Sequence, residues 1–91
     1  MAEHDLKTWP SFFNAIAEGR KTFEARRADR DFDVGDVLIL HEWDPTRNGS
    51  ALSDCAGYTT REMRVRVTYV LRGGEFGVLP GYCVMAIQRE E

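Results

Sequence analysis

The clearest periodic pattern in the chain lies near its N-terminus and predicts a helix of about three turns. Its apolar residues recur at helical spacing and form one broad face, made of Trp9, Phe12, Phe13, Ile16 and Ala17. Thr8 is expected to cap the helix, with Pro10 in its first turn. Gly19 suits the position just after its last turn. We expect Trp9 to pack into the core with the rest of this face.

The pattern in most of the remaining chain predicts short strands. They are predicted over residues 4–7, 21–27, 37–43, 63–71 and 82–87. Alternation is most regular in the fourth of these, where Met63, Val65, Val67, Tyr69 and Leu71 should point inward and the intervening residues, Val70 included, outward.

Turn residues separate these strands and limit the fold. A tight turn is expected at residues 34–36, a break at Gly73 and Gly74, and a long loop over residues 44–60. One helix, four or five strands and no second helix do not fit a layered parallel α/β sheet. We therefore predict a mainly β (α+β) single domain over residues 1–91, a partly closed β-barrel of about five strands with one N-terminal helix.

Charge changes this picture locally. The net charge of −3 argues against a protein held to nucleic acid by a broad basic surface. Residues 20–30, however, contain five cations and two acids. The sequence thus predicts a local basic face on an acidic protein.

Other classes of function receive little support. No run of residues approaches the roughly 18 apolar positions of a membrane span, and residues 1–5 lack the apolar core of a secretory signal, so we expect a cytoplasmic protein with no membrane contact. Two cysteines and two histidines are not at ligand spacing, so neither a metal nor a cofactor is expected. Cys83 should be a small core residue, whereas Cys55 lies in a polar loop. His4 and His41 are expected to be structural or solvated.

The segment after the helix holds the strongest candidate site. In a regular strand, Thr22, Glu24 and Arg26 share one face, and Phe23 and Ala25 the other. Glu24 and Arg26 could then pair with each other or bind a ligand together. Lys21 has the wrong parity for that face unless the strand begins with a bulge or Lys21 belongs to the turn after the helix. The alternative is a surface strand whose charges pair in water, worth about 0–1 kcal/mol.

Four motifs in this order resemble the ASCH (ASC-1 homology) domains of the PUA-like superfamily. They are His-x-Leu-Lys-Thr-Trp-Pro at 4–10, Gly-Arg-Lys-Thr-Phe-Glu at 19–24, Phe-x-Val-Gly-Asp at 32–36 and Gly-Tyr-x-Val-Met at 81–85. The chain is closer still to a small, often phage- or plasmid-associated bacterial group of such domains. The resemblance covers nearly the whole chain and implies a PUA-like barrel with a cleft beside the helix.

The resemblance also implies a class of ligand, because domains of this superfamily are mostly associated with RNA, often in contexts that involve modified nucleosides. We therefore predict a module that binds RNA or a modified nucleotide. Cations would meet phosphate or carbonyl oxygens, Glu24 would accept from an exocyclic amine or a ribose hydroxyl, and an aromatic ring would stack on a base. The predicted binding residues are Lys7, Lys21, Glu24, Arg26, Trp43 and Tyr82.

An enzymatic alternative comes from the same resemblance. Some small bacterial ASCH proteins are similar to amidohydrolases that deacetylate N4-acetylcytidine with a lysine, a threonine and a glutamate. The lysine carries over onto Lys21, but Glu24 stands where the threonine would fall, and Thr22 comes two residues early. Glu75 is the sole acid in the segment that would carry the glutamate. Because two of the three catalytic roles lack a matching residue, the sequence does not favour an enzyme of this kind.

A third reading is an accessory protein of a phage or mobile element that binds a host protein. Its mark would be an exposed apolar patch instead of a charged cleft. The loop over residues 44–60, with Ala51, Leu52 and Tyr58, is the expected place for one.

Overall fold

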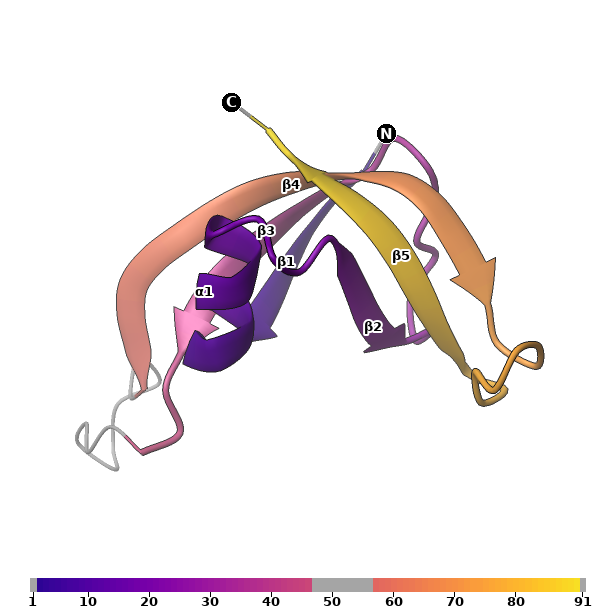
Figure 1. Cartoon of the computed structure of the whole chain (residues 1–91), viewed down its shortest axis with the longest axis horizontal. Coiled ribbons are helices and arrows are strands. Elements are labelled where there is room, and N and C mark those ends of the chain that lie inside the picture. Colours follow the sequence, from indigo (N-terminus) through magenta and orange to yellow (C-terminus); the bar gives the residue numbers. More distant parts are fainter. Residues whose placement is uncertain (1, 47–56, 91) are drawn as a thin grey trace.

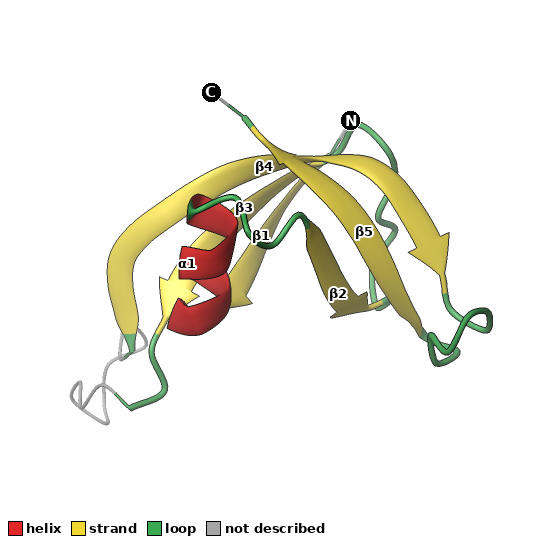
Figure 2. Ribbon diagram, viewed as in Figure 1, coloured by secondary structure: helices red, strands yellow, loops and turns green. Residues whose placement is uncertain are grey.

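The computed structural model describes residues 2–46 and 57–90 as a half-barrel of five strands with one short helix (Figure 1). The elements in chain order are β1 (Glu3–Thr8), α1 (Pro10–Ala17), β2 (Phe23–Arg27), β3 (Val37–Trp43), β4 (Tyr58–Arg72) and β5 (Tyr82–Arg89). The sheet is strongly curved, and α1 lies under its arch (Figure 2). The predicted mainly β, partly closed barrel with an N-terminal helix is confirmed.

The order of the strands shows where the barrel stays open. They are arranged β1-β3-β4-β5-β2; β1 pairs with β3 in parallel, and the other neighbours are antiparallel. The first two strands of the chain therefore lie at opposite edges of the sheet, and α1 connects them. No ladder of main-chain hydrogen bonds joins these two edges in the described part of the chain.

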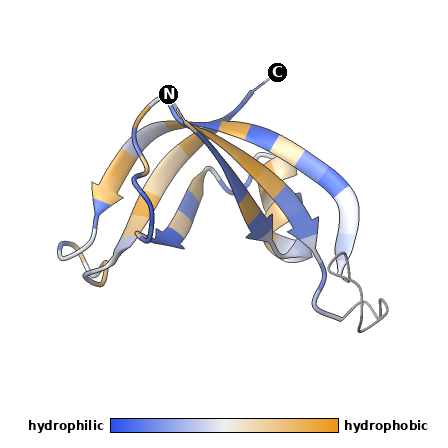
Figure 3. Ribbon diagram, turned by 180° about the vertical axis from the view of Figure 1, so that it is seen from behind, coloured by the Kyte–Doolittle hydropathy of each residue, from blue (hydrophilic) through white to orange (hydrophobic). Residues whose placement is uncertain are grey.

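The core lies between the concave face of the sheet and α1. Strand β3 is buried on both faces at its start, over residues 37–40. Bands of hydrophobic and hydrophilic residues alternate along the other long strands (Figure 3). The principal core residues are Leu6, Phe13, Ile16, Phe32, Leu38, Leu40, Met63, Val65, Val67, Cys83, Met85 and Ile87. Cys83 is thus the core residue that was predicted, and burial raises the pKa of its thiol.

The N-terminus of α1 differs from the prediction. Trp9, not Thr8, is the N-cap residue, and its backbone is extended with φ −65° and ψ 151°. Proline disfavours helical backbone in the residue before it, so Pro10 keeps Trp9 outside the helix. Thr8 remains the last residue of β1.

No helix in the described ranges has the length and apolar content needed to span a membrane.

The C-terminus of α1 follows the prediction closely. Gly19 has a positive φ of 80°. Its N–H donates to the carbonyl of Ile16, and the N–H of Arg20 donates to the carbonyl of Ala15. This pair of bonds is the Schellman motif, which satisfies carbonyls that the helix leaves free.

A bulge in β4 alters the predicted alternation. Its register with β5 shifts between Val67 and Tyr69. An extra residue reverses the two faces of a strand beyond that point. Tyr69, predicted to point inward, is 63% exposed, whereas Val70 packs against the core. Both predictions were wrong for this reason. β4 also begins at Tyr58, inside the predicted loop.

Candidate functional site

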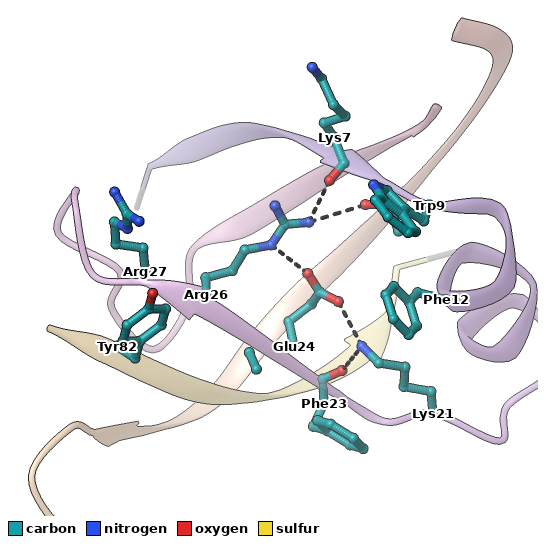
Figure 4. Close-up of a pocket in the computed structure, with 11 residues that line it drawn as sticks. Lys7, Trp9, Phe12, Lys21, Phe23, Glu24, Arg26, Arg27 and Tyr82 are labelled. Atoms are coloured by element: carbon teal, nitrogen blue, oxygen red, sulfur yellow. Dashed lines mark hydrogen bonds and ion pairs between the residues drawn. The ribbon is translucent and has the colours of Figure 1, made fainter. Parts of the chain in front are cut away.

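The open side of the half-barrel contains a cavity of about 610 Å³ (Figure 4). It lies among the end of β1, the start of α1, strand β2 and the start of β5, and its volume is in the range of small-molecule sites. The lining residues are Lys7, Thr8, Trp9, Phe12, Lys21, Phe23, Glu24, Ala25, Arg26, Arg27 and Tyr82. The structure thus brings together five of the six predicted binding residues.

Glu24 is the buried centre of this cavity. Its side chain is 5% exposed, and each carboxylate oxygen accepts one hydrogen bond from a cation. Lys21 Nζ lies 2.7 Å from Oε1, and Arg26 Nε lies 2.7 Å from Oε2. Burial removes water from a carboxylate, and such partners replace its lost hydrogen bonds. The three side chains therefore form one connected charged group.

The turn after α1 brings Lys21 to this face. Lys21 precedes β2, and its N–H donates to the carbonyl of Ala15 in the last turn of the helix. Its ammonium group also donates to the main-chain carbonyl of Phe23 at 2.7 Å. Lys21 therefore belongs to the turn after the helix, as one of the two sequence interpretations proposed. The alternation of faces along β2 does not apply to it, so its side chain can reach Glu24.

Arg26 spans the opening between the two edge strands. Its Nη2 donates to the carbonyl of Lys7 at 2.8 Å and to the hydroxyl of Thr8 at 3.3 Å. One guanidinium thus contacts β1 with one nitrogen and Glu24 with another. Only the planar fork of arginine allows this arrangement.

Aromatic side chains form the walls. Trp9, Phe12, Phe23 and Tyr82 are 41–52% exposed. Lys21 Nζ lies 4.7 Å from the ring centroid of Phe23 and 5.6 Å from that of Phe12, within reach of cation–π attraction. The cavity therefore combines flat apolar surfaces with a charged floor.

The expectation that Trp9 packs in the core was wrong. Because Pro10 holds Trp9 at the N-cap, its side chain leaves the buried face of the helix and lines the cavity. Phe13 and Ile16 are the helical residues that are fully buried, and Phe12 lies beside them at the edge. The proline after Trp9 was the feature of the sequence that could have predicted the exposure of Trp9. The helical pattern did not show that Phe12 would line the cavity while Phe13 would be buried.

The charge of the lining contrasts with that of the chain. Four cations and one acid give a net charge of +3, against −3 for the whole protein. Lys7 Nζ lies 4.4 Å from the ring centroid of Trp43. Arg27 has no hydrogen bond or ion pair from its side chain among residues 2–46 and 57–90. The cavity thus favours an anionic ligand.

Other predicted residues lie elsewhere. Trp43 is outside the lining of the cavity, and its ring contacts Lys7, which is in the lining. Thr22 and Lys21 line a second, smaller cavity of about 310 Å³. Glu75 lies in the β4–β5 turn and lines neither cavity. The lysine, threonine and glutamate of the enzymatic alternative are therefore not gathered in one site.

The histidines have carboxylate partners. His4 Nε2 lies 2.9 Å from Asp36 Oδ2, and His41 Nε2 lies 2.8 Å from Asp5 Oδ1. The described residues contain no cluster of three or more histidine, cysteine, aspartate or glutamate side chains suited to a metal ion.

Part of the expected protein-binding patch lies beyond the described residues. Ala51, Leu52 and Cys55 fall outside them. Tyr58 is the first residue of β4 and is 36% exposed. The proposed patch in this loop stays a prediction.

The chain is similar to a known family and to a phage protein. A family model described as "Domain of unknown function (DUF3850)" matches residues 3–87. Over 40 residues the chain is 45% identical to an "Uncharacterized 12.9 kDa protein in GpA 3'region" of Escherichia phage P2. That alignment covers 44% of this chain and 37% of the phage protein, so the chain spans little more than a third of that relative. These matches support the predicted phage-associated group, and the ASCH assignment stays a prediction.

Proposed function

The chain belongs to the DUF3850 family, and we propose that it binds single-stranded RNA or a nucleotide in the cavity between β1, α1 and β2. One observation carries this proposal. Four half-exposed aromatic rings surround a buried, charged floor in a cavity whose net charge is positive.

The aromatic rings suit a nucleobase. Exposed apolar side chains that gather at a cavity indicate a binding surface, whereas single exposed apolar residues scattered over a protein do not. Every base has a flat π-face, and stacking on an aromatic side chain is worth about 1–3 kcal/mol per base. Trp9 offers the largest ring and lines the cavity from the N-cap position of α1 (Figure 4).

The cations suit the rest of a nucleotide. Arg27 lies at the rim and has no carboxylate partner among the described residues, so it is available for phosphate oxygens. The side chain of Lys7 points away from Arg26, and its ammonium group lies over the ring of Trp43 (Figure 4). Lys21 and Arg26 lie deeper, and Glu24 holds both in place. We assign Glu24 the role of a positioning residue, which keeps two donors aimed at the ligand.

The experiment that tests this proposal is fluorescence anisotropy with a labelled single-stranded RNA hexamer of mixed sequence. We expect saturable binding by the parent protein and about tenfold weaker binding by Trp9→Ala, because one stacking interaction is lost. Tyr69→Ala is the matched control, since Tyr69 is exposed on β4 and does not line the cavity. Absence of saturable binding would contradict the proposal, as would equal loss in the Trp9 and Tyr69 variants.

Salt dependence gives a second readout of the same binding. Each phosphate neutralised on a single strand contributes about 0.7 to the slope of log affinity against log salt. Arg27→Ala should lower that slope, whereas Arg20→Ala should leave it unchanged, because Arg20 pairs with Glu18 outside the cavity. Equal slopes for the parent and Arg27→Ala would show that Arg27 does not contact a phosphate of the RNA.

A further inference from the structure

We infer that a bound base pairs, through its Watson–Crick edge, with the main-chain N–H and carbonyl of Ala25 on the open edge of β2. This inference rests on the proposed nucleotide-binding function and specifies which part of the nucleotide the cavity recognises. Such a site accepts each of the four unmodified bases and rejects a base that carries a methyl group on the ring nitrogen of that edge.

The cavity lies along the edge of β2 and not over one of its faces. β2 is an outer strand of the sheet, and all 5 of its residues, from Phe23 to Arg27, line the cavity. Side chains alternate between the two faces of a strand, so a single cavity reaches all of them only from the edge. The end of β1 and the start of α1 line the opposite side (Figure 4).

The hydrogen bonds of the sheet show which main-chain groups of β2 point to this edge. Just before β2, the carbonyl of Thr22 accepts from the N–H of Ile87. Just after it, the N–H of Ala28 donates to the carbonyl of Gly81. Hydrogen-bonded residues alternate in an antiparallel pair, and the register of β2 with β5 is continuous. The N–H and the carbonyl of Ala25 therefore point away from β5, to the open edge.

Ala25 offers the accessible donor and acceptor of this edge. It is exposed, and its short side chain does not cover its main chain. The carbonyl of Phe23 points to the same edge but already accepts from the ammonium group of Lys21. The carboxylate of Glu24 accepts from two cations, and the residue is only 4% exposed. A ligand in the cavity therefore reaches the main chain of Ala25 more easily than the carboxylate.

One N–H beside one carbonyl matches the Watson–Crick edge of a base. Each base has an acceptor next to a donor on that edge, such as O4 beside N3–H in uracil, or N3 beside the amine in cytosine. The N–H of Ala25 donates to the acceptor, and its carbonyl accepts from the donor. Oxo and amine bases both satisfy this pair, so the site does not separate them. Stacking uses the face of the base and leaves this edge free.

An extended peptide is the other ligand that can pair with an open strand edge. A peptide strand between β2 and β1 would have to displace the side chain of Arg26, whose Nη2 donates to the carbonyl of Lys7. It would also compete with Lys21 for the carbonyl of Phe23. A base needs the main-chain groups of one residue, so these contacts favour a base.

Isothermal titration calorimetry with three nucleotides tests the inference. Uridine 5′-monophosphate is the reference, and its N3-methyl and C5-methyl derivatives carry the same added group on different edges of the base. N3-methylation removes the donor and places a methyl group against the carbonyl of Ala25, so we expect about tenfold weaker binding. The C5-methyl derivative should bind within about twofold of the reference, because its methyl group lies on another edge. Equal affinities of the two derivatives would overturn the inference.

Amide hydrogen exchange, followed by NMR, locates the contact in the parent protein. The N–H of Ala25 should exchange rapidly in the free protein and about tenfold more slowly when uridine monophosphate saturates the site. The N–H groups of Glu24 and Arg26 are bonded to β5 and serve as internal controls, whose exchange should change little. Unchanged exchange at Ala25 in the saturated protein would contradict the assignment.

Two variants of Ala25 test its N–H directly. Ala25→Pro removes this donor, and an edge strand tolerates proline where the N–H does not join the ladder. It should weaken uridine monophosphate about tenfold. Ala25→Gly keeps the N–H and should bind as the parent does. Equal affinities of the two variants would show that the N–H does not contact the base.

The outcomes separate this inference from the function on which it rests. If uridine monophosphate and its two methyl derivatives bind equally well, the inference is wrong and the proposed function stands. If neither the monophosphates nor the RNA hexamer binds, the proposed function is wrong, and the inference falls with it.

Discussion

The guanidinium of Arg26 donates to the main-chain carbonyl of Lys7 at 2.8 Å and so links the two edge strands of the half-barrel. The same side chain donates to Glu24 at 2.7 Å. A side chain therefore stands where a closed barrel would have main-chain hydrogen bonds. The opening that it spans is the proposed ligand site, so the stability of this edge and the shape of the site are coupled.

Replacement of Arg26 by lysine tests this link. Lysine retains the charge but has a single nitrogen, which cannot reach Glu24, Lys7 and Thr8 together. We expect Arg26→Lys to lower the free energy of unfolding by about 1–2 kcal/mol, as the loss of one or two hydrogen bonds predicts. Urea denaturation measures this change. Arg27→Lys is the neighbouring control and should have little effect, and equal stability of the two variants would show that Arg26 does not join the strands.

The buried carboxylate of Asp36 predicts a loss of stability in acid. Burial alone would raise its pKa, but hydrogen bonds from the Ala2 amide, from His4 and from the Asp33 amide outweigh that effect, and the pKa of Asp36 is lowered from 3.8. The unfolded chain therefore takes up this proton at a higher pH than the folded chain. The stabilisation is present above the unfolded pKa, and it is lost as the pH falls from about 4 through the lower folded pKa.

Circular dichroism melts between pH 7 and pH 2 measure this contribution. Asp36→Asn should be less stable at pH 7 by about 1–3 kcal/mol, because a buried amide nitrogen would face donors. It should also lose less stability than the parent as the solution is acidified below about pH 4. Asp31→Asn changes the charge equally on an exposed residue of the same loop. Parallel melting curves for the parent and Asp36→Asn across the acid range would contradict the prediction.

Phe76 marks a strained position in the β4–β5 turn. It has a positive φ of 52° and is 89% exposed. Left-handed backbone costs a bulky residue roughly 1–2 kcal/mol, whereas asparagine adopts it more easily. We expect Phe76→Asn to raise the free energy of unfolding by about 0.5–1 kcal/mol in urea denaturation.

A nearby exposed residue controls for the change in hydrophobicity. Leu79 is 65% exposed in the same turn and does not have a positive φ, so Leu79→Asn should alter stability by less than about 0.5 kcal/mol. A decrease in stability for Phe76→Asn would show that the ring makes interactions that outweigh the strain.

Local rules predicted the fold well where one rule acts alone. Gly19 ends the helix with the positive φ that glycine adopts readily, and the apolar run from Val37 to Leu40 forms the buried start of the interior strand β3. Two rules compete at the start of the helix. Helical periodicity placed Trp9 in the core, but the restriction that Pro10 imposes on the preceding residue moved it to the cavity.

Long-range packing decided the features that the sequence did not predict. The bulge near Thr68 follows from the pairing of β4 with β5. The sequence around Thr68 has no glycine, proline or asparagine that would predict it. The meeting of Arg26 with Lys7 needs the two edge strands to approach each other across the sheet. Alternation along residues 22–26 correctly paired Glu24 with Arg26, since that interaction lies within one strand face.

Fluorescence of Trp9 during titration with single-stranded RNA tests the central claim most directly. The chain has two tryptophans, so Trp43→Phe leaves Trp9 as the sole reporter, placed in the cavity wall. If a base stacks on this ring, the emission of Trp9 should change saturably, with the same midpoint as the anisotropy of the labelled hexamer. An unchanged emission while the hexamer binds would place the RNA elsewhere on the protein and contradict the proposed site.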